Sequence, residues 1–238
     1  MQRVAALTQR ELAASFFSPV AYVVATVFLV ATGYLFMSTT LIEGGEASVR
    51  PLLDSMAWLL IFAIPMLTMR ALSEEFSTGT IEALMTAPVT DIEVVFGKFL
   101  GVLIFYAALL LTTLFHVILL LKFGKADLGV IFYGYVGMLL LGALYVAVGV
   151  FASAITKYHL VAALIAMGVL CIFSIVVDSF ASWRGGMWRV ILSNINVLHH
   201  FEDFSKGILD TSAIIFFISA TIFFLFLAVK VLESRRWR

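Results

Sequence analysis

Six long apolar stretches run through this 238-residue sequence, and they restrict the solvent in which the chain can fold. Each stretch is close to the length of about 20 residues that an α-helix needs to cross the hydrocarbon core of a bilayer. Mostly apolar runs of this length predict transmembrane helices. The predicted spans are residues 19–40, 53–71, 98–121, 129–153, 160–179 and 211–232.

The composition supports an all-α, polytopic membrane protein with six transmembrane helices. Hydrophobic residues make up 63% of the chain and charged residues only 13%, which is about half the charge typical of a soluble domain. Too little polar surface remains to cover a water-soluble globule, so we expect the lipid bilayer as surroundings and one transmembrane domain over residues 1–238. The net charge is zero, which argues against a nucleic-acid partner.

The distribution of Lys and Arg predicts the orientation of the spans. Cytoplasmic loops of membrane proteins carry an excess of these residues, so the richer side is expected to face the cytoplasm. Nine of them fall on the side that also holds both chain ends: Arg3, Arg10, Arg70, Lys98, Lys157, Lys230, Arg235, Arg236 and Arg238. Six fall on the other side: Arg50, Lys122, Lys125, Arg184, Arg189 and Lys206. We therefore predict that both termini are cytoplasmic.

Two segments outside the spans have their own predicted structure. Residues 1–17 mix apolar and polar side chains at helical spacing, which predicts an amphipathic interfacial helix on the inner membrane surface; a frayed tail is the alternative. Residues 180–210 are too long and too aromatic for a plain loop. We expect short helices there, in an extracytoplasmic segment that helps to close a pathway.

Small residues gather in the fourth predicted span. Gly142, Ala143, Ala147 and Gly149 give this span a small face. Such residues let helices approach each other closely in a membrane. Close packing is therefore expected, either inside one subunit or between two subunits.

The segment between the second and third spans is far longer than a connector needs. Residues 70–98 hold five of the 15 acidic residues, and their composition favours helix on both sides of Gly79. Gly79 permits a sharp turn or a positive φ between two short helices within residues 72–88. Thr90 and Glu93 have the spacing of a capping box at the start of the next span. A solvated acidic loop is the alternative interpretation.

This segment resembles the coupling region of the ABC-2 type permease superfamily. The pattern of that region is an Arg, a Glu, Gly-Thr-x-Glu-x-Leu, a short Thr/Ser-Ala/Ser-Pro and a Gly-Lys that opens the next span. It is present here as Arg70, Glu74 or Glu75, Gly79-Thr80-Ile81-Glu82-Ala83-Leu84, Thr86-Ala87-Pro88 and Gly97-Lys98. The stretches Glu11–Tyr22 and His199–Asp210 are similar to the branch that includes gliding-motility permeases. Lys157-Tyr158-His159 departs from the smaller polar turn expected there.

The resemblance implies a permease subunit of an ATP-binding cassette transporter. An ATPase dimer on separate chains would bind ATP and Mg, two permease chains would form the pathway, and this chain would need no cofactor. Export across a bacterial inner membrane is the expected direction. Contacts with the ATPase would come from the coupling segment, with apolar anchors at Leu72, Phe76, Ile81 and Leu84 and acids at the rim. The ATPase-coupling residues implied in this way are Arg70, Leu72, Glu74, Glu75, Phe76, Gly79, Thr80, Glu82, Leu84 and Pro88.

Motifs for catalysis are absent from the sequence. No Gly-x-x-x-x-Gly-Lys-Ser/Thr phosphate loop occurs, and Gly97-Lys98-Phe99 lacks both the upstream glycine and the hydroxyl. We also find no His-Glu-x-x-His zinc helix and no Gly-x-Ser-x-Gly elbow. The prediction is a transport subunit rather than an enzyme, with no catalytic residue and no metal site in this chain.

Two ionisable residues in the spans are candidates for the transport pathway. His116 lies inside the third span, where an ionisable group is costly unless it has a role. Asp178 ends the fifth span near the outer face, where a plain interfacial position is the alternative to contact with the cargo. For His116, a neutral ring bonded to a neighbouring backbone or hydroxyl group is the alternative. An ATP-independent secondary transporter would need more intramembrane acids than these spans hold. A membrane scaffold through which an ATPase drives another machine would carry the same coupling segment, so it stays open.

Overall fold

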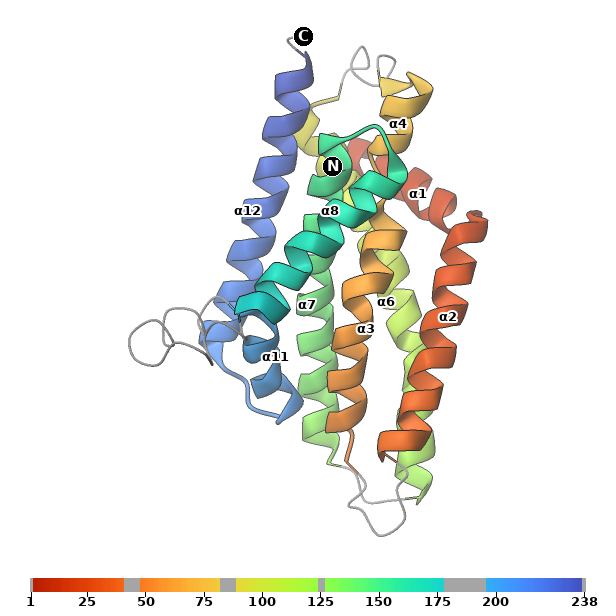
Figure 1. The fold of residues 1–238 in the computed structure, drawn as a ribbon, viewed down its shortest axis with the longest axis vertical. Coiled ribbons are helices and arrows are strands. Elements are labelled where there is room, and N and C mark those ends of the chain that lie inside the picture. The colour runs from red at the N-terminus through yellow and green to blue at the C-terminus, as the bar shows by residue number, and fades with distance from the viewer. Residues whose placement is uncertain (1, 41–47, 82–88, 124–126, 178–195, 237–238) are drawn as a thin grey trace.

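The computed structural model describes residues 2–40, 48–81, 89–123, 127–177 and 196–236, in which every regular element is a helix (Figure 1). The predicted all-α fold is confirmed for these residues. The elements are α1 (Gln2–Phe16), α2 (Pro19–Leu35), the π-helical η1 (Phe36–Thr40), α3 (Arg50–Thr68), α4 (Ser73–Thr78), α6 (Asp91–Phe123), α7 (Leu128–Ile155), α8 (His159–Cys171), the π-helical η2 (Ile172–Val176), α11 (Val197–Ser205) and α12 (Thr211–Arg236).

Six segments are long and apolar enough to cross a membrane, as predicted: Pro19–Thr40, Arg50–Thr78, Asp91–Lys122, Leu128–Ile155, His159–Val176 and Thr211–Arg235. The second segment joins α3 to α4 across a turn at residues 69–72. The protein is therefore a multi-pass membrane protein.

The third span begins earlier than predicted, at Asp91 instead of residue 98. The capping box extends the helix backwards. The Thr90 N–H donates to Glu93 Oε2 at 2.9 Å, and the Glu93 N–H donates to Thr90 Oγ1 at 3.3 Å. Lys98 consequently lies about two turns inside α6 and not at its first residue.

Helix α7 is the centre of the bundle, where it contacts α3, α6, α8, α11 and α12. Its predicted small face is confirmed by close approach of neighbouring helices. A Cβ atom built at Gly142 would lie 2.0 Å from Tyr106 of α6, and one at Gly149 would lie 2.0 Å from Thr68 of α3. Tyr106 is fully buried and donates its hydroxyl to the Met138 carbonyl at 2.8 Å. These contacts explain why glycine occupies both positions.

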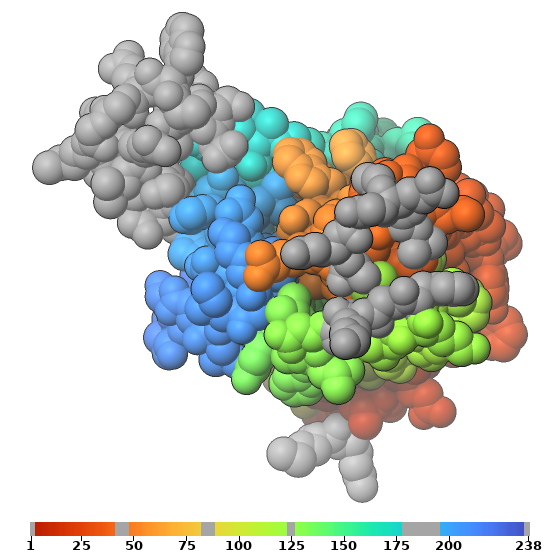
Figure 2. Space-filling model, turned by 90° about the horizontal axis from the view of Figure 1, so that it is seen from below, coloured from red at the N-terminus to blue at the C-terminus, as the bar shows by residue number. Residues whose placement is uncertain are grey.

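Both ends of the described chain lie at one end of the bundle, which we call the terminal end (Figure 1). Helix α1 packs there against α6, α4 lies above the end of α3, and α12 finishes beside them. The helix predicted within residues 1–17 is thus present, while its placement on a membrane surface stays a prediction. Figure 2 views the opposite end, where α11 and α12 (blue) lie on one side and α2 (orange-red) lies on the other.

A short helix is present in the segment predicted to be extracytoplasmic. Asn196 caps α11, because its side-chain oxygen accepts hydrogen bonds from the N–H groups of Leu198 and His199 at 2.9 and 3.3 Å. Helix α11 packs on α7 and α3. Residues 178–195 lie outside the described residues, so the rest of that prediction stays open.

The packing of α7 predicts a difference between two glycine substitutions. Gly142→Leu forces the Tyr106 ring away from α7, and such overpacking costs about 1–3 kcal/mol. The expected drop in melting temperature in detergent is about 2–12 °C. The matched control is Gly168→Leu in α8, where an added Cβ meets nothing within 4 Å. Equal melting temperatures for the two variants would contradict the tight α6–α7 contact.

Candidate functional site

The candidate site is centred on α4, the six-residue helix inside the segment singled out in the sequence. Gly79 ends α4 with a φ of +74°, in the left-handed region, which confirms the positive dihedral expected there. The structure thus confirms the first of the two predicted short helices. The second one falls on residues 82–88, outside the described residues.

The N-terminus of α4 is held by a side chain from α7. Leu72 occupies the N-cap position and has no side-chain oxygen with which to accept from the exposed backbone N–H groups. Ser153 supplies that acceptor instead. Its Oγ accepts from the Leu72 N–H at 2.8 Å and from the Ser73 N–H at 2.9 Å. The helix is therefore capped by a residue about 80 positions later in the chain.

A second polar contact joins the same end of α4 to α8. The Ser73 hydroxyl donates to the Met69 carbonyl at 2.5 Å and lies 2.7 Å from His159 Nδ1. Because the hydroxyl proton is directed at Met69, the His159 ring must donate from Nδ1 to the Ser73 oxygen. His159 is the first residue of α8, so this contact ties α4 to the α7–α8 turn.

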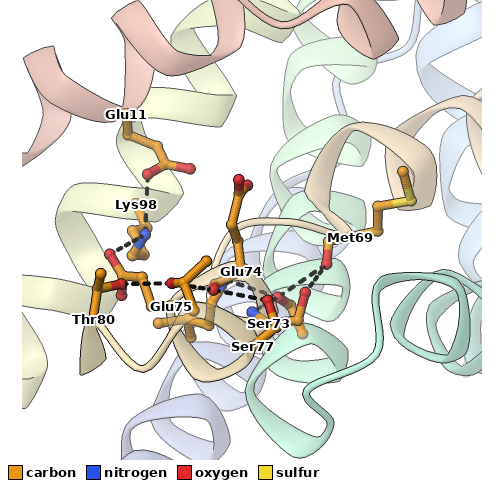
Figure 3. A network of polar contacts seen from close by, with 11 residues as sticks. Glu11, Met69, Ser73, Glu74, Glu75, Ser77, Thr80 and Lys98 are labelled. Carbon is orange, nitrogen blue, oxygen red and sulfur yellow. Dashed lines mark hydrogen bonds and ion pairs between the residues drawn. The ribbon is translucent and has the colours of Figure 1, made fainter. Parts of the chain in front are cut away.

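The other side of α4 is joined to α1 and α6 by a buried ion-pair cluster (Figure 3). Lys98 of α6 lies between two carboxylates, 3.1 Å from Glu11 Oε2 of α1 and 3.0 Å from Glu75 Oε1 of α4. Only 7% of the Lys98 side chain is exposed, against 18% for Glu11 and 12% for Glu75. The second oxygen of Glu75 is buried and accepts no hydrogen bond from the described residues.

Burial changes the electrostatics of this cluster. It raises the pKa of the Glu11 carboxyl above its ordinary value, and the Lys98 ammonium opposes that shift by the smaller amount. Ionised Glu11 is therefore not a strong net source of stability. The ammonium of Lys98, by contrast, is the only cation that pairs with Glu11 and Glu75 among the described ion pairs.

The end of α12 completes the surroundings of α4. The guanidinium of Arg235 lies over the Phe76 ring, 4.3 Å from its centroid, which is a cation–π geometry. Arg235 also donates to the Ile155 carbonyl at the end of α7. Helix α4 consequently contacts α6, α7, α8 and α12 through side chains, and Lys98 links it to α1.

The predicted coupling residues differ in exposure. Arg70, Glu74, Gly79 and Thr80 are exposed, whereas Glu75 and Phe76 are half-buried and belong to the contacts just described. Leu72 is fully buried, so its side chain supports α4 from beneath and presents no surface to another protein in this conformation. Glu82, Leu84 and Pro88 lie outside the described residues.

Of the two pathway candidates, His116 belongs to the described residues and lies away from α4. His116 is buried in α6, its Nδ1 lies 3.2 Å from the Thr113 carbonyl, and its ring packs edge-on against Phe36 at 5.2 Å. The ring thus bonds to the backbone of its own helix, and a pathway role for His116 stays a prediction. Asp178 lies outside the described residues.

Sequence reasoning did not predict that five residues hold α4: Glu11, Lys98, Ser153, His159 and Arg235, although Lys98 belongs to the family pattern of the coupling region. Glu11 and Lys98 carried a usable signal, because each is a charge close to the edge of an apolar stretch. Ser153 carried none, since serine is common in membrane helices and its partner on α4 is distant in sequence.

Comparison with known proteins gives one positive result. A family model described as "ABC-2 family transporter protein" matches residues 4–231, nearly the whole chain. A search of curated proteins found no match.

The cluster around Lys98 predicts unequal effects of two substitutions. Lys98→Met leaves two neighbouring carboxylates buried without a cation, which costs about 3–5 kcal/mol. Glu11→Gln keeps an oxygen acceptor for Lys98 and removes a charge that burial disfavours, so its cost is expected below about 1 kcal/mol. Thermal unfolding of the purified variants in detergent measures the difference. A Glu11→Gln variant as unstable as Lys98→Met would contradict this account of the cluster.

The cap from α7 predicts a local change in backbone exchange. Ser153→Ala leaves the Leu72 and Ser73 N–H groups without an acceptor, at a cost of about 1–3 kcal/mol. Hydrogen–deuterium exchange should become faster in peptides covering residues 69–78, with little change elsewhere. Ser219→Ala is the control, because the exposed Ser219 hydroxyl bonds only to the Phe216 carbonyl of its own helix. Unchanged exchange at α4 would show that Ser153 does not hold it.

Proposed function

We propose that this chain, which belongs to the ABC-2 transporter family, is the permease subunit of an ATP-binding cassette transporter whose ATPase subunits are separate chains. Members of this family are the membrane-embedded transport components and generally work with an ABC ATPase. Six apolar helices agree with such a role. ATP and Mg would then be bound by the partner, in keeping with the lack of a phosphate loop in this sequence.

The observation that supports coupling through this chain is the attachment of α4. An exposed strip on α4 and the turn after it, formed by Ser77 and Gly79, is available to a partner. The opposite side of α4 is fixed to four other helices by the contacts of Lys98, Ser153, His159 and Arg235, and Lys98 extends the link to α1 through Glu11. A force applied to the exposed strip would therefore be passed to α1, α6, α7, α8 and α12 together.

The charge distribution supports an orientation. The terminal end carries Arg70 and Lys98 with both chain ends, in line with the nine-to-six excess of Lys and Arg in the sequence. We place this end in the cytoplasm, where an ATPase dimer would find α4. The membrane would be a bacterial inner membrane, and a second permease chain would complete a pathway that exports or extrudes its cargo.

The proposal predicts how coupling responds to the backbone at Gly79. An added Cβ there meets nothing within 4 Å, so a substitution tests backbone conformation alone. Gly79→Val forces a β-branched residue into the left-handed region, which costs about 1–2 kcal/mol, whereas Asn tolerates it. We expect Gly79→Val to lower the ATPase rate of the co-purified complex about fivefold or more, and Gly79→Asn to retain most of it.

Two outcomes would contradict the proposal. If no ATPase subunit co-purifies with the tagged chain from its native host, the permease assignment fails. If an ATPase co-purifies but Gly79→Val and Gly79→Asn hydrolyse ATP equally fast, α4 is not the coupling element.

A further inference from the structure

A cavity of about 480 Å³ opens at the terminal end between α1, α2, the end of α3, α4 and α6. This volume falls in the range of small-molecule sites, about 300–1,000 Å³. One part of its lining is apolar, with Phe17, Pro19, Val20, Met66, Leu67, Val102 and Phe105. The other part holds three cations and three carboxylates: Arg10, Arg70, Lys98, Glu11, Glu74 and Glu75.

The charges of the cavity fall into two groups. Lys98 is already shared by Glu11 and Glu75 in the buried cluster. The side chains of Arg10, Arg70 and Glu74 are exposed, and they make no hydrogen bond or ion pair with a described residue. Two guanidinium groups and one carboxylate are thus left for a ligand that carries both signs of charge.

The start of α2 also favours an anion in the part of the cavity that Arg10 and Arg70 line. Ser18 is the N-cap residue and lines the cavity, and its side chain makes no capping hydrogen bond. The first turn of this 17-residue helix therefore brings the positive end of its dipole and a hydroxyl without a capping bond to the cavity that Arg10 and Arg70 also line. Guanidinium groups together with a helix N-terminus suit a phosphate.

The position of the cavity restricts the source of such a ligand. Pro19 is the first residue of one membrane-spanning segment, and Met66 and Leu67 belong to the end of α3. The cavity therefore lies at the boundary between the apolar bundle and its charged terminal end, the depth at which lipid headgroups are found. Its apolar lining continues toward the spans.

We propose that this cavity binds an ethanolamine phospholipid. The phosphate would contact Arg10, Arg70 and the start of α2, the primary ammonium would donate to Glu74, and the acyl chains would follow the apolar lining. A choline headgroup has no N–H to donate to Glu74, and a purely anionic headgroup brings no cation to pair with that carboxylate. The inference needs only the bilayer, so it does not rest on the proposed function.

Native mass spectrometry of the purified chain tests it, with dioleoyl phosphatidylethanolamine, phosphatidylglycerol and phosphatidylcholine titrated separately. The wild type should bind the ethanolamine lipid about tenfold more tightly than the other two, as one charged hydrogen bond allows. Arg70→Gln should weaken binding of the ethanolamine lipid about tenfold. Glu74→Gln should remove its advantage over phosphatidylglycerol. The control is Lys157→Gln, an exposed charge that does not line the cavity.

The remaining outcomes overturn the proposal. Equal affinities for the three lipids, with no effect of either variant, would mean that no headgroup is recognised. A wild-type preference for phosphatidylglycerol would mean an anion site without an ammonium contact. Soluble phosphoethanolamine binding as tightly as the lipid would mean that the apolar lining takes no acyl chain.

Discussion

The terminal end of this bundle depends on one buried ammonium group. Lys98 lies in an apolar helix and is almost wholly removed from water, which is tolerable only while Glu11 and Glu75 neutralise it at 3.1 and 3.0 Å. Those carboxylates come from α1 and α4, so each of these helices is tied to α6 by its own ion pair with the same ammonium. Three elements far apart in sequence are therefore docked as one unit.

The remaining contacts of α4 likewise depend on a few single side chains from other helices. A helix of six residues has little stability of its own, since helices shorter than about 12 residues are marginal in water. Ser153 caps its N-terminus, His159 bonds to Ser73, and Arg235 covers Phe76. The exposed side of α4 is left free, and this division of the helix into a fixed and an open side is what a coupling element requires.

Much of the fold could be predicted, because the backbone of a membrane-spanning segment must satisfy its hydrogen bonds without water. A run of about 20 apolar residues therefore forms a helix. The capping box at Thr90 and Glu93 and the positive φ at Gly79 were also readable, since both are local. The long-range contacts were not. Glu11 and Lys98 lie 87 positions apart, and no periodicity relates them. The prediction that Leu72 faces a partner failed in this conformation because spacing alone cannot show which face of a short helix is buried.

The central claim is that Lys98 fixes α4 to α1. The most direct measurement is the distance between spin labels at Gln9 of α1 and Ser77 of α4, two exposed positions, in a Cys171→Ala background that removes the only native cysteine. By this account the labels give one narrow distance distribution, and Lys98→Met broadens it. A distribution that stays narrow and unshifted in Lys98→Met would show that α4 is held to α1 without the buried ammonium.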